Sequence, residues 1–111
     1  MLFRSSLASR PDILYAFLVI QTFKDSRTEA LHNGRVPKGV PSDIAKRAVI
    51  KLFLLDTVTR VEDLRVPPGN RLHALSGDRS GQWSISVNDQ WRICFSWRDG
   101  DAYDAEFVDY H

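Results

Sequence analysis

GDRSGQWSISVNDQWRICFSWRDGDAYDAEFVDYH, residues Gly77 to His111, carries the clearest structural pattern in the chain. Large apolar residues alternate with small or polar ones through 83–87 and again through 91–97. That period of two is typical of strands with one buried face. The Asp-Gly pair at Asp99 and Gly100 predicts a hairpin turn, and 102–108 then forms a last strand. These residues therefore predict an antiparallel meander, with a further short strand at 71–75.

In the residues before this meander, apolar side chains recur at helical spacing rather than at every second position. Pro41-Ser42-Asp43 opens the longest predicted helix, whose apolar stripe is Ile44, Ala48, Leu52 and Leu55. Residues 19–23 predict a first strand, and 25–32 predict a shorter helix that Asn33-Gly34 closes. Residues 57–66 continue as a turn or short helix, which the run Pro67-Pro68-Gly69-Asn70 stops. The expected class is α+β, with N-terminal helices packed on one face of a small antiparallel sheet.

Length and composition predict one globular domain. The chain has 111 residues, of which 43% are hydrophobic and 26% charged, so disorder and coiled coil are disfavoured. Its single cysteine, Cys94, excludes an internal disulfide and is typical of a reducing cytosol. Cys94 lies in an apolar run, which favours a packed small residue over a nucleophile. We expect a cytoplasmic protein.

The net charge of +1 conceals an uneven distribution. Residues 1–79 hold 13 Lys and Arg against 8 Asp and Glu, whereas residues 80–111 hold 2 against 6. A basic front half suggests a polyanionic partner, and a solvated surface is the alternative. Lys46, Arg47 and Lys51 on the long helix are candidate RNA-binding residues, and an exposed helix face is the alternative.

Residues 1–18 do not match the rest of the chain. Arg4 and Arg10 precede the apolar run 13–20, but no small-x-small cleavage site follows and the run is too short to span a bilayer. We expect an extension outside the domain, or an artefact of the chosen start with Val19 as the natural one. The domain itself is expected over 19–111.

The strand alternation selects Arg92 as the centre of a candidate site. With Trp91, Ile93, Phe95 and Trp97 facing the helices, Arg92 points to the other face beside small residues. An arginine in such a shallow surface suits a phosphate. The alternative is that Arg92 pairs with Glu106 or Asp104 of the next strand.

The chain ends on three proton-handling residues, Asp109, Tyr110 and His111. Together with His73 and Arg79 they indicate acid–base cleavage of an RNA phosphodiester, in which the ribose 2′-hydroxyl attacks the adjacent phosphorus. No group of ligands has metal-binding spacing, so no metal or other cofactor is predicted.

At these residues the sequence resembles the HigB-type toxins of the RelE/ParE superfamily, the plasmid maintenance system killer proteins. The resemblance covers about 19–111. Its most specific parts are the segments 64–72, 77–85, 88–95 and 108–111.

The resemblance implies a RelE-like fold that enters the ribosomal A site and cleaves mRNA there. It implies a HigA-type helix-turn-helix antitoxin, through which alone the toxin reaches operator DNA, and no membrane association. It assigns the scissile phosphate to Arg92 and catalysis to His73, Asp109, Tyr110 and His111.

One position departs from the pattern, because Ser76 stands where many family members carry a lysine. Arg79 could partly replace that missing cation. Two other functions stay open at this point: a ParE-like toxin that poisons DNA gyrase, and a weakly active toxin that serves mainly as a co-repressor with its antitoxin.

Overall fold

The alternating C-terminal residues form the predicted antiparallel sheet in the computed structural model, which describes residues 18–110. Within those residues the sheet has four strands, hydrogen-bonded in chain order. They are β1 (His73–Ala74), β2 (Gln82–Ser86), β3 (Trp91–Arg98) and β4 (Asp101–Asp109). The meander is therefore confirmed, with β1 much shorter than predicted.

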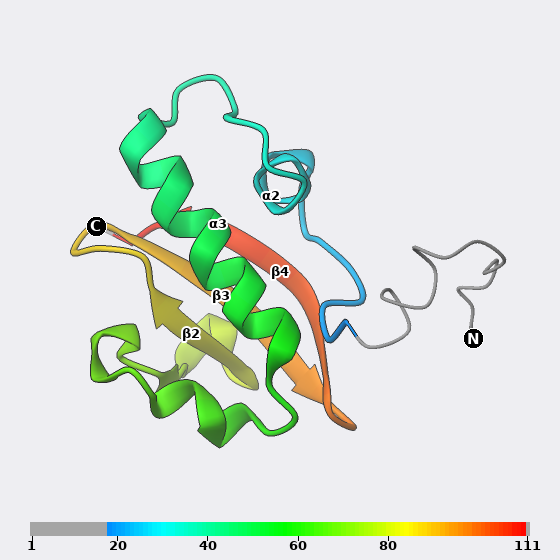
Figure 1. Cartoon of the computed structure of the whole chain (residues 1–111). Coiled ribbons are helices and arrows are strands. Elements are labelled where there is room, and N and C mark those ends of the chain that lie inside the picture. The colour runs from blue at the N-terminus through cyan, green and yellow to red at the C-terminus, as the bar shows by residue number, and fades with distance from the viewer. Residues whose placement is uncertain (1–17, 111) are drawn as a thin grey trace, which may run out of the picture.

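Two helices cover one face of this sheet, as Figure 1 shows, with α3 crossing over the strands and α2 beside β4. Helix α2 spans Ser26–His32, and the Asp25 carboxylate caps it by accepting a 2.8 Å hydrogen bond from the Thr28 backbone N–H. Helix α3 spans Ser42–Thr57. Three short 3₁₀ helices follow: η1 (Val61–Arg65), η2 (Pro68–Asn70) and η3 (Gly77–Arg79).

The core lies between α3 and the sheet. Ile93 and Phe95 of β3 and Phe107 of β4 are completely buried there, against Leu52 and Leu55 of the α3 stripe. Trp91 stacks on Phe107 with ring centroids 4.4 Å apart, at the edge of this core. The predicted α+β class, with helices on one face, is confirmed.

Residues 19–23 do not form the continuous strand that the sequence predicts. Ile20 and Phe23 instead make isolated parallel bridges to Ala102 and Ala105 of β4. The reason is an irregularity in β4 at Asp104, whose φ of 55° interrupts the ladder. The Thr22 hydroxyl fills this gap by accepting a 2.8 Å hydrogen bond from the Asp104 backbone N–H.

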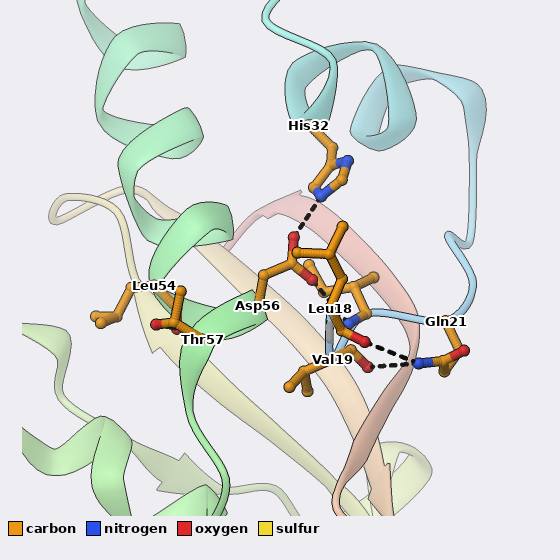
Figure 2. Close-up of polar contacts among 8 residues, drawn as sticks. Leu18, Val19, Gln21, His32, Leu54, Asp56 and Thr57 are labelled. Carbon is orange, nitrogen blue, oxygen red and sulfur yellow. Dashed lines mark hydrogen bonds and ion pairs between the residues drawn. The ribbon is translucent and has the colours of Figure 1, made fainter. Parts of the chain in front are cut away.

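A buried carboxylate at the end of α3 fixes this N-terminal segment (Figure 2). Asp56 is 3% exposed, and its Oδ1 accepts a 2.8 Å hydrogen bond from the Ile20 backbone N–H. Its Oδ2 lies 2.5 Å from His32 Nε2 on α2. That hydrogen bond raises the pKa of His32 above its ordinary value, although burial opposes the shift. One side chain thus joins α2, α3 and residues 18–21. The predicted extension over 1–18 lies, apart from Leu18, outside the described residues.

Candidate functional site

Arg92 lies on the sheet face opposite the helices, as the alternation predicts. It is the second residue of β3 and pairs with Ser86 on one side and Val108 on the other. Its Nε donates to the Ser84 hydroxyl and its Nη2 donates to the Arg71 carbonyl, both at 2.8 Å. Burial is the main cause that lowers the pKa of its guanidinium, which is nonetheless charged at any physiological pH.

The alternative that Arg92 pairs with a carboxylate of β4 is wrong. Glu106 instead accepts a hydrogen bond from Arg79 Nη2 at 3.2 Å, and Arg79 Nη1 donates to the Gln82 side chain. The backbone and side chain of Asp104 are bonded to Thr22. Among the described residues, Arg92 therefore holds a positive charge that no acidic side chain compensates, whereas the charge of Arg79 is compensated.

Tyr110 lies beside Arg92 on this face. The Arg92 guanidinium carbon is 5.4 Å from the centre of the Tyr110 ring, and Tyr110 is 48% exposed. The position is fixed by the backbone, because the Tyr110 N–H donates to the Gln90 carbonyl at 2.7 Å and so extends the β3–β4 ladder. A phenol and a guanidinium thus share one open surface.

Asp109 does not join them, although it is next in sequence. It pairs with Trp91 across the ladder, and paired residues share a face, so its side chain belongs to the helix side. Its carboxylate accepts a 2.8 Å hydrogen bond from Gln90 Nε2. The structure therefore separates the predicted terminal group by strand alternation. His111 lies outside the described residues.

His73 does face the Arg92 side. It is exposed on β1 and pairs with Ser84, the residue whose hydroxyl accepts from Arg92 Nε. Ser84 on β2 also pairs with Cys94 on β3, and both residues are fully buried. Burial raises the pKa of the Cys94 thiol, which disfavours the thiolate. The prediction that Cys94 is a packed residue is confirmed.

The cations of α3 border a cleft next to this surface. Arg47 and Lys51 line it together with Arg71 of the η2 segment, and its volume is about 270 Å³. Gly69 and residues 86–89 complete the wall. Lys51 donates a hydrogen bond to Asn70, and burial together with Arg47 lowers its pKa. Lys46 is exposed on the same helix but does not line the cleft.

Within residues 18–110 no cluster of three or more His, Cys, Asp or Glu side chains is arranged to hold a metal ion. In the same range no helix is both long and apolar enough to cross a membrane.

Two site residues were not selected from the sequence. The Arg71 backbone carbonyl accepts a hydrogen bond from Arg92. Arg71 itself has a left-handed backbone conformation (φ 47°, ψ 53°) and ends the η2 helix. The only available signal was its place after the Pro67–Asn70 stop. Gln90 holds both Tyr110 and Asp109, but the sequence shows it merely as part of a turn.

Comparison with known proteins identifies the family of this chain. A family model described as "RelE-like toxin of type II toxin-antitoxin system HigB" matches residues 21–111. The chain is 39% identical over 93 residues to "Endoribonuclease HigB" of Proteus vulgaris, a match that covers 84% of this chain and all of that protein. It is also 39% identical over 90 residues to "Toxin HigB-1" of Vibrio cholerae, covering 80% of this chain and 94% of that one.

A solved structure supports the fold independently. The crystal structure of a YafQ mutant from E. coli superposes with a TM-score of 0.52, covering 82% of this chain and 91% of that chain, at 15% sequence identity. The family match spans nearly all the described residues and includes Arg92, Tyr110 and His73. The chain belongs to the HigB family of RelE-like toxins of type II toxin–antitoxin systems.

Proposed function

We propose that this toxin is an endoribonuclease that cuts mRNA on the ribosome and so stops translation. The observation that carries the proposal is the guanidinium of Arg92, half-buried on the open sheet face with no acidic partner among the described residues. A fixed, uncompensated cation of this kind is suited to an anion that develops charge during reaction. The relative from Proteus vulgaris is named an endoribonuclease, which supports the same reaction.

The proposed reaction uses the ribose 2′-hydroxyl as an internal nucleophile. A base removes its proton, its oxygen bonds to the adjacent phosphorus, and the bond from phosphorus to the 5′-oxygen breaks as that oxygen takes up a proton. The products are a 2′,3′-cyclic phosphate and a 5′-hydroxyl. Arg92 stabilises the negative charge on the phosphorane oxygens through its two-pronged donor geometry. The nucleophile is supplied by the substrate, so no step calls for a metal or another cofactor.

Proton transfer is assigned to the residues that share the Arg92 face. The Tyr110 ring centre lies 5.4 Å from the Arg92 guanidinium carbon. His73 on β1 pairs with Ser84 of β2, whose hydroxyl accepts from Arg92 Nε. His111 lies outside the described residues, and only the family resemblance adds it to the proposed set. Asp109, on the other face, acts through Gln90, whose side chain it holds and whose carbonyl holds Tyr110.

The remaining cations have different proposed roles. Lys46, Arg47 and Lys51 bind the RNA backbone, while Arg79 contacts RNA only when its ion pair with Glu106 opens. Ser76 provides no charge, and Arg79 does not replace it in the paired state. We therefore expect a slower enzyme than family members that have lysine at this position.

A type II toxin acts together with an antitoxin. We propose that this partner is a HigA-type helix-turn-helix protein, that the toxin reaches operator DNA only through it, and that the toxin acts in the cytoplasm. Family membership supports each of these assignments.

Primer extension on cellular mRNA after brief induction tests the proposed reaction. We expect new 5′ ends in translated frames after induction of the wild-type chain and none after induction of Arg92→Ala. Growth arrest with DNA damage and intact mRNA would indicate a gyrase poison instead. Normal growth with antitoxin binding retained would indicate a co-repressor without nuclease activity.

A further inference from the structure

The cleft between α3 and the β2–β3 turn has an unusual charge balance. Three cations line it, Arg47, Lys51 and Arg71, and the single carboxylate among its lining residues is that of Asp89. The Asp89 side chain is 95% exposed and lies 3.8 Å from Arg71, a geometry that stabilises little. Lys51 is partly desolvated beside Arg47, and both effects lower its pKa. The free protein thus holds cations close together with little compensation.

The surface at the opposite end of β2, around Gln82, is built differently. A second pocket of about 330 Å³ lies there, and its lining contains Asp78, Asp104 and Glu106 as well as Lys24, Arg79 and Gln82. Its carboxylates outnumber its cations, and Arg79 is bonded to Glu106. A phosphate chain would be repelled at this end and attracted at the other.

Arg71 connects the basic cleft to the Arg92 site. Its carbonyl accepts from Arg92 Nη2 at 2.8 Å, and the same residue lines the cleft. Ser86, another lining residue, pairs directly with Arg92 across the β2–β3 ladder. The cleft therefore borders the Arg92 site through Arg71 and Ser86.

We propose that the cleft lined by Arg47, Lys51 and Arg71 is a second phosphate subsite, which binds the RNA phosphate next to the scissile one and directs the strand toward α3. The proposal rests on the function proposed above. It adds a direction to the substrate: the strand leaves Arg92 on the side of the β2–β3 turn, away from Glu106. Lys51 is already held by buried Asn70, which fixes its ammonium at the cleft wall before RNA binds.

Strand-length dependence of binding tests this subsite. The probes are 2′-O-methyl oligouridylates, which lack the nucleophile: a dinucleotide with one phosphate and a tetranucleotide with three, each with a dye at its 3′ end. Affinities are measured by fluorescence anisotropy over a range of salt concentrations. The variants are Arg47→Gln and Lys51→Gln, and the matched control is Arg60→Gln. Arg60 also carries one charge, but it lies beyond the far end of α3, with a side chain 70% exposed.

We expect each cleft variant to bind the tetranucleotide about tenfold more weakly, since each loses a charge-assisted contact. The salt slope of binding should fall by about 0.7, the value for one single-strand phosphate contact. Dinucleotide binding and the control should be unchanged. Equal weakening by Arg60→Gln, or equal weakening of both probes, would overturn the subsite. If the wild-type chain cuts mRNA in an Arg92-dependent way while the cleft variants bind normally, the subsite fails and the proposed function stands. If no cutting occurs, the proposed function fails by itself.

Discussion

Replacing Asp56 by alanine should destabilise the fold without touching the Arg92 face. Asp56 is buried at the end of α3 and accepts from the Ile20 backbone N–H. It also bonds to the His32 ring, as Figure 2 shows. Removing the Asp56 side chain leaves the Ile20 N–H unsatisfied, because the Asp56 backbone carbonyl already accepts a hydrogen bond from the Val19 N–H. The bonds of Gln21 and Lys24 to β4 remain, so the native topology should persist.

The expected loss is about 3 kcal/mol. An unsatisfied buried N–H costs roughly 1–3 kcal/mol, and a hydrogen bond involving charged groups contributes roughly 1.5–3 kcal/mol. The lower half of the summed range applies, because His32 is partly exposed and can be hydrated once unpaired. The free energy of unfolding of a domain of this size is about 5–15 kcal/mol, so the variant should fold but melt at a clearly lower temperature than the wild type.

The pair also predicts a pH dependence. Asp56 is the main cause that raises the pKa of His32, and Glu29 raises it further. A raised folded-state pKa means that the stabilisation is complete below about pH 6.5, the ordinary histidine value, and is lost as pH rises through the folded-state value. Stability should therefore fall between about pH 6.5 and the folded-state pKa of His32, by at most about 1.4 kcal/mol per pH unit.

Urea denaturation from about pH 5.5 to 8.5 measures both effects across the histidine range. Asp56→Asn is the control, because it keeps an acceptor for Ile20 but removes the charge, so its stability should be less dependent on pH across that window. A wild-type stability that rises with pH through the window, or an Asp56→Ala loss below about 1 kcal/mol, would show that the pair does not act in this way.

Three further changes concern the candidate site. Tyr110→Phe keeps the ring beside Arg92 but removes the phenol, so mRNA cleavage should slow by about 10²-fold with unchanged melting, and an unchanged rate would exclude Tyr110 from proton transfer. Ser76→Lys adds the cation that the family resemblance leads us to expect here and should speed cleavage several-fold in the same assay; an unchanged rate would show that charge at this position does not assist the reaction. Glu106→Gln frees Arg79 and should tighten RNA binding at low salt, with a stability cost under about 1 kcal/mol because the pair is partly exposed; weaker binding would contradict this role.

Much of the fold could be predicted from local patterns. The strict alternation of 91–97 placed Arg92 opposite the helices, and the Asp-Gly turn fixed the last hairpin. The prediction of a continuous strand over 19–23 was wrong, because the pairing of these residues depends on an irregularity in β4 at Asp104. The positive φ of Asp104 causes that irregularity, and the sequence around it gives no signal for such a conformation.

The site was harder to predict, because its partners come from tertiary contacts. Sequence proximity grouped Asp109 with Tyr110, but alternation sends neighbouring strand residues to opposite faces. Arg71 contributes a carbonyl, and every residue has one, so composition could not distinguish it. Arg79 and Arg92 look equivalent as cations, and only the position of Glu106 shows which charge is compensated.

Cleavage of RNA on the Arg92 face, by attack of the internal 2′-hydroxyl, is the proposal on which the other assignments depend. Single-turnover cutting of mRNA on isolated ribosomes tests it, with the product ends identified by mass. We predict 2′,3′-cyclic phosphate and 5′-hydroxyl ends, and a rate about 10²–10³-fold lower for Arg92→Ala than for the wild type, with Arg98→Ala as the unaffected arginine control. Cutting by Arg92→Ala at the wild-type rate, or products that carry a 5′-phosphate, would be incompatible with this mechanism.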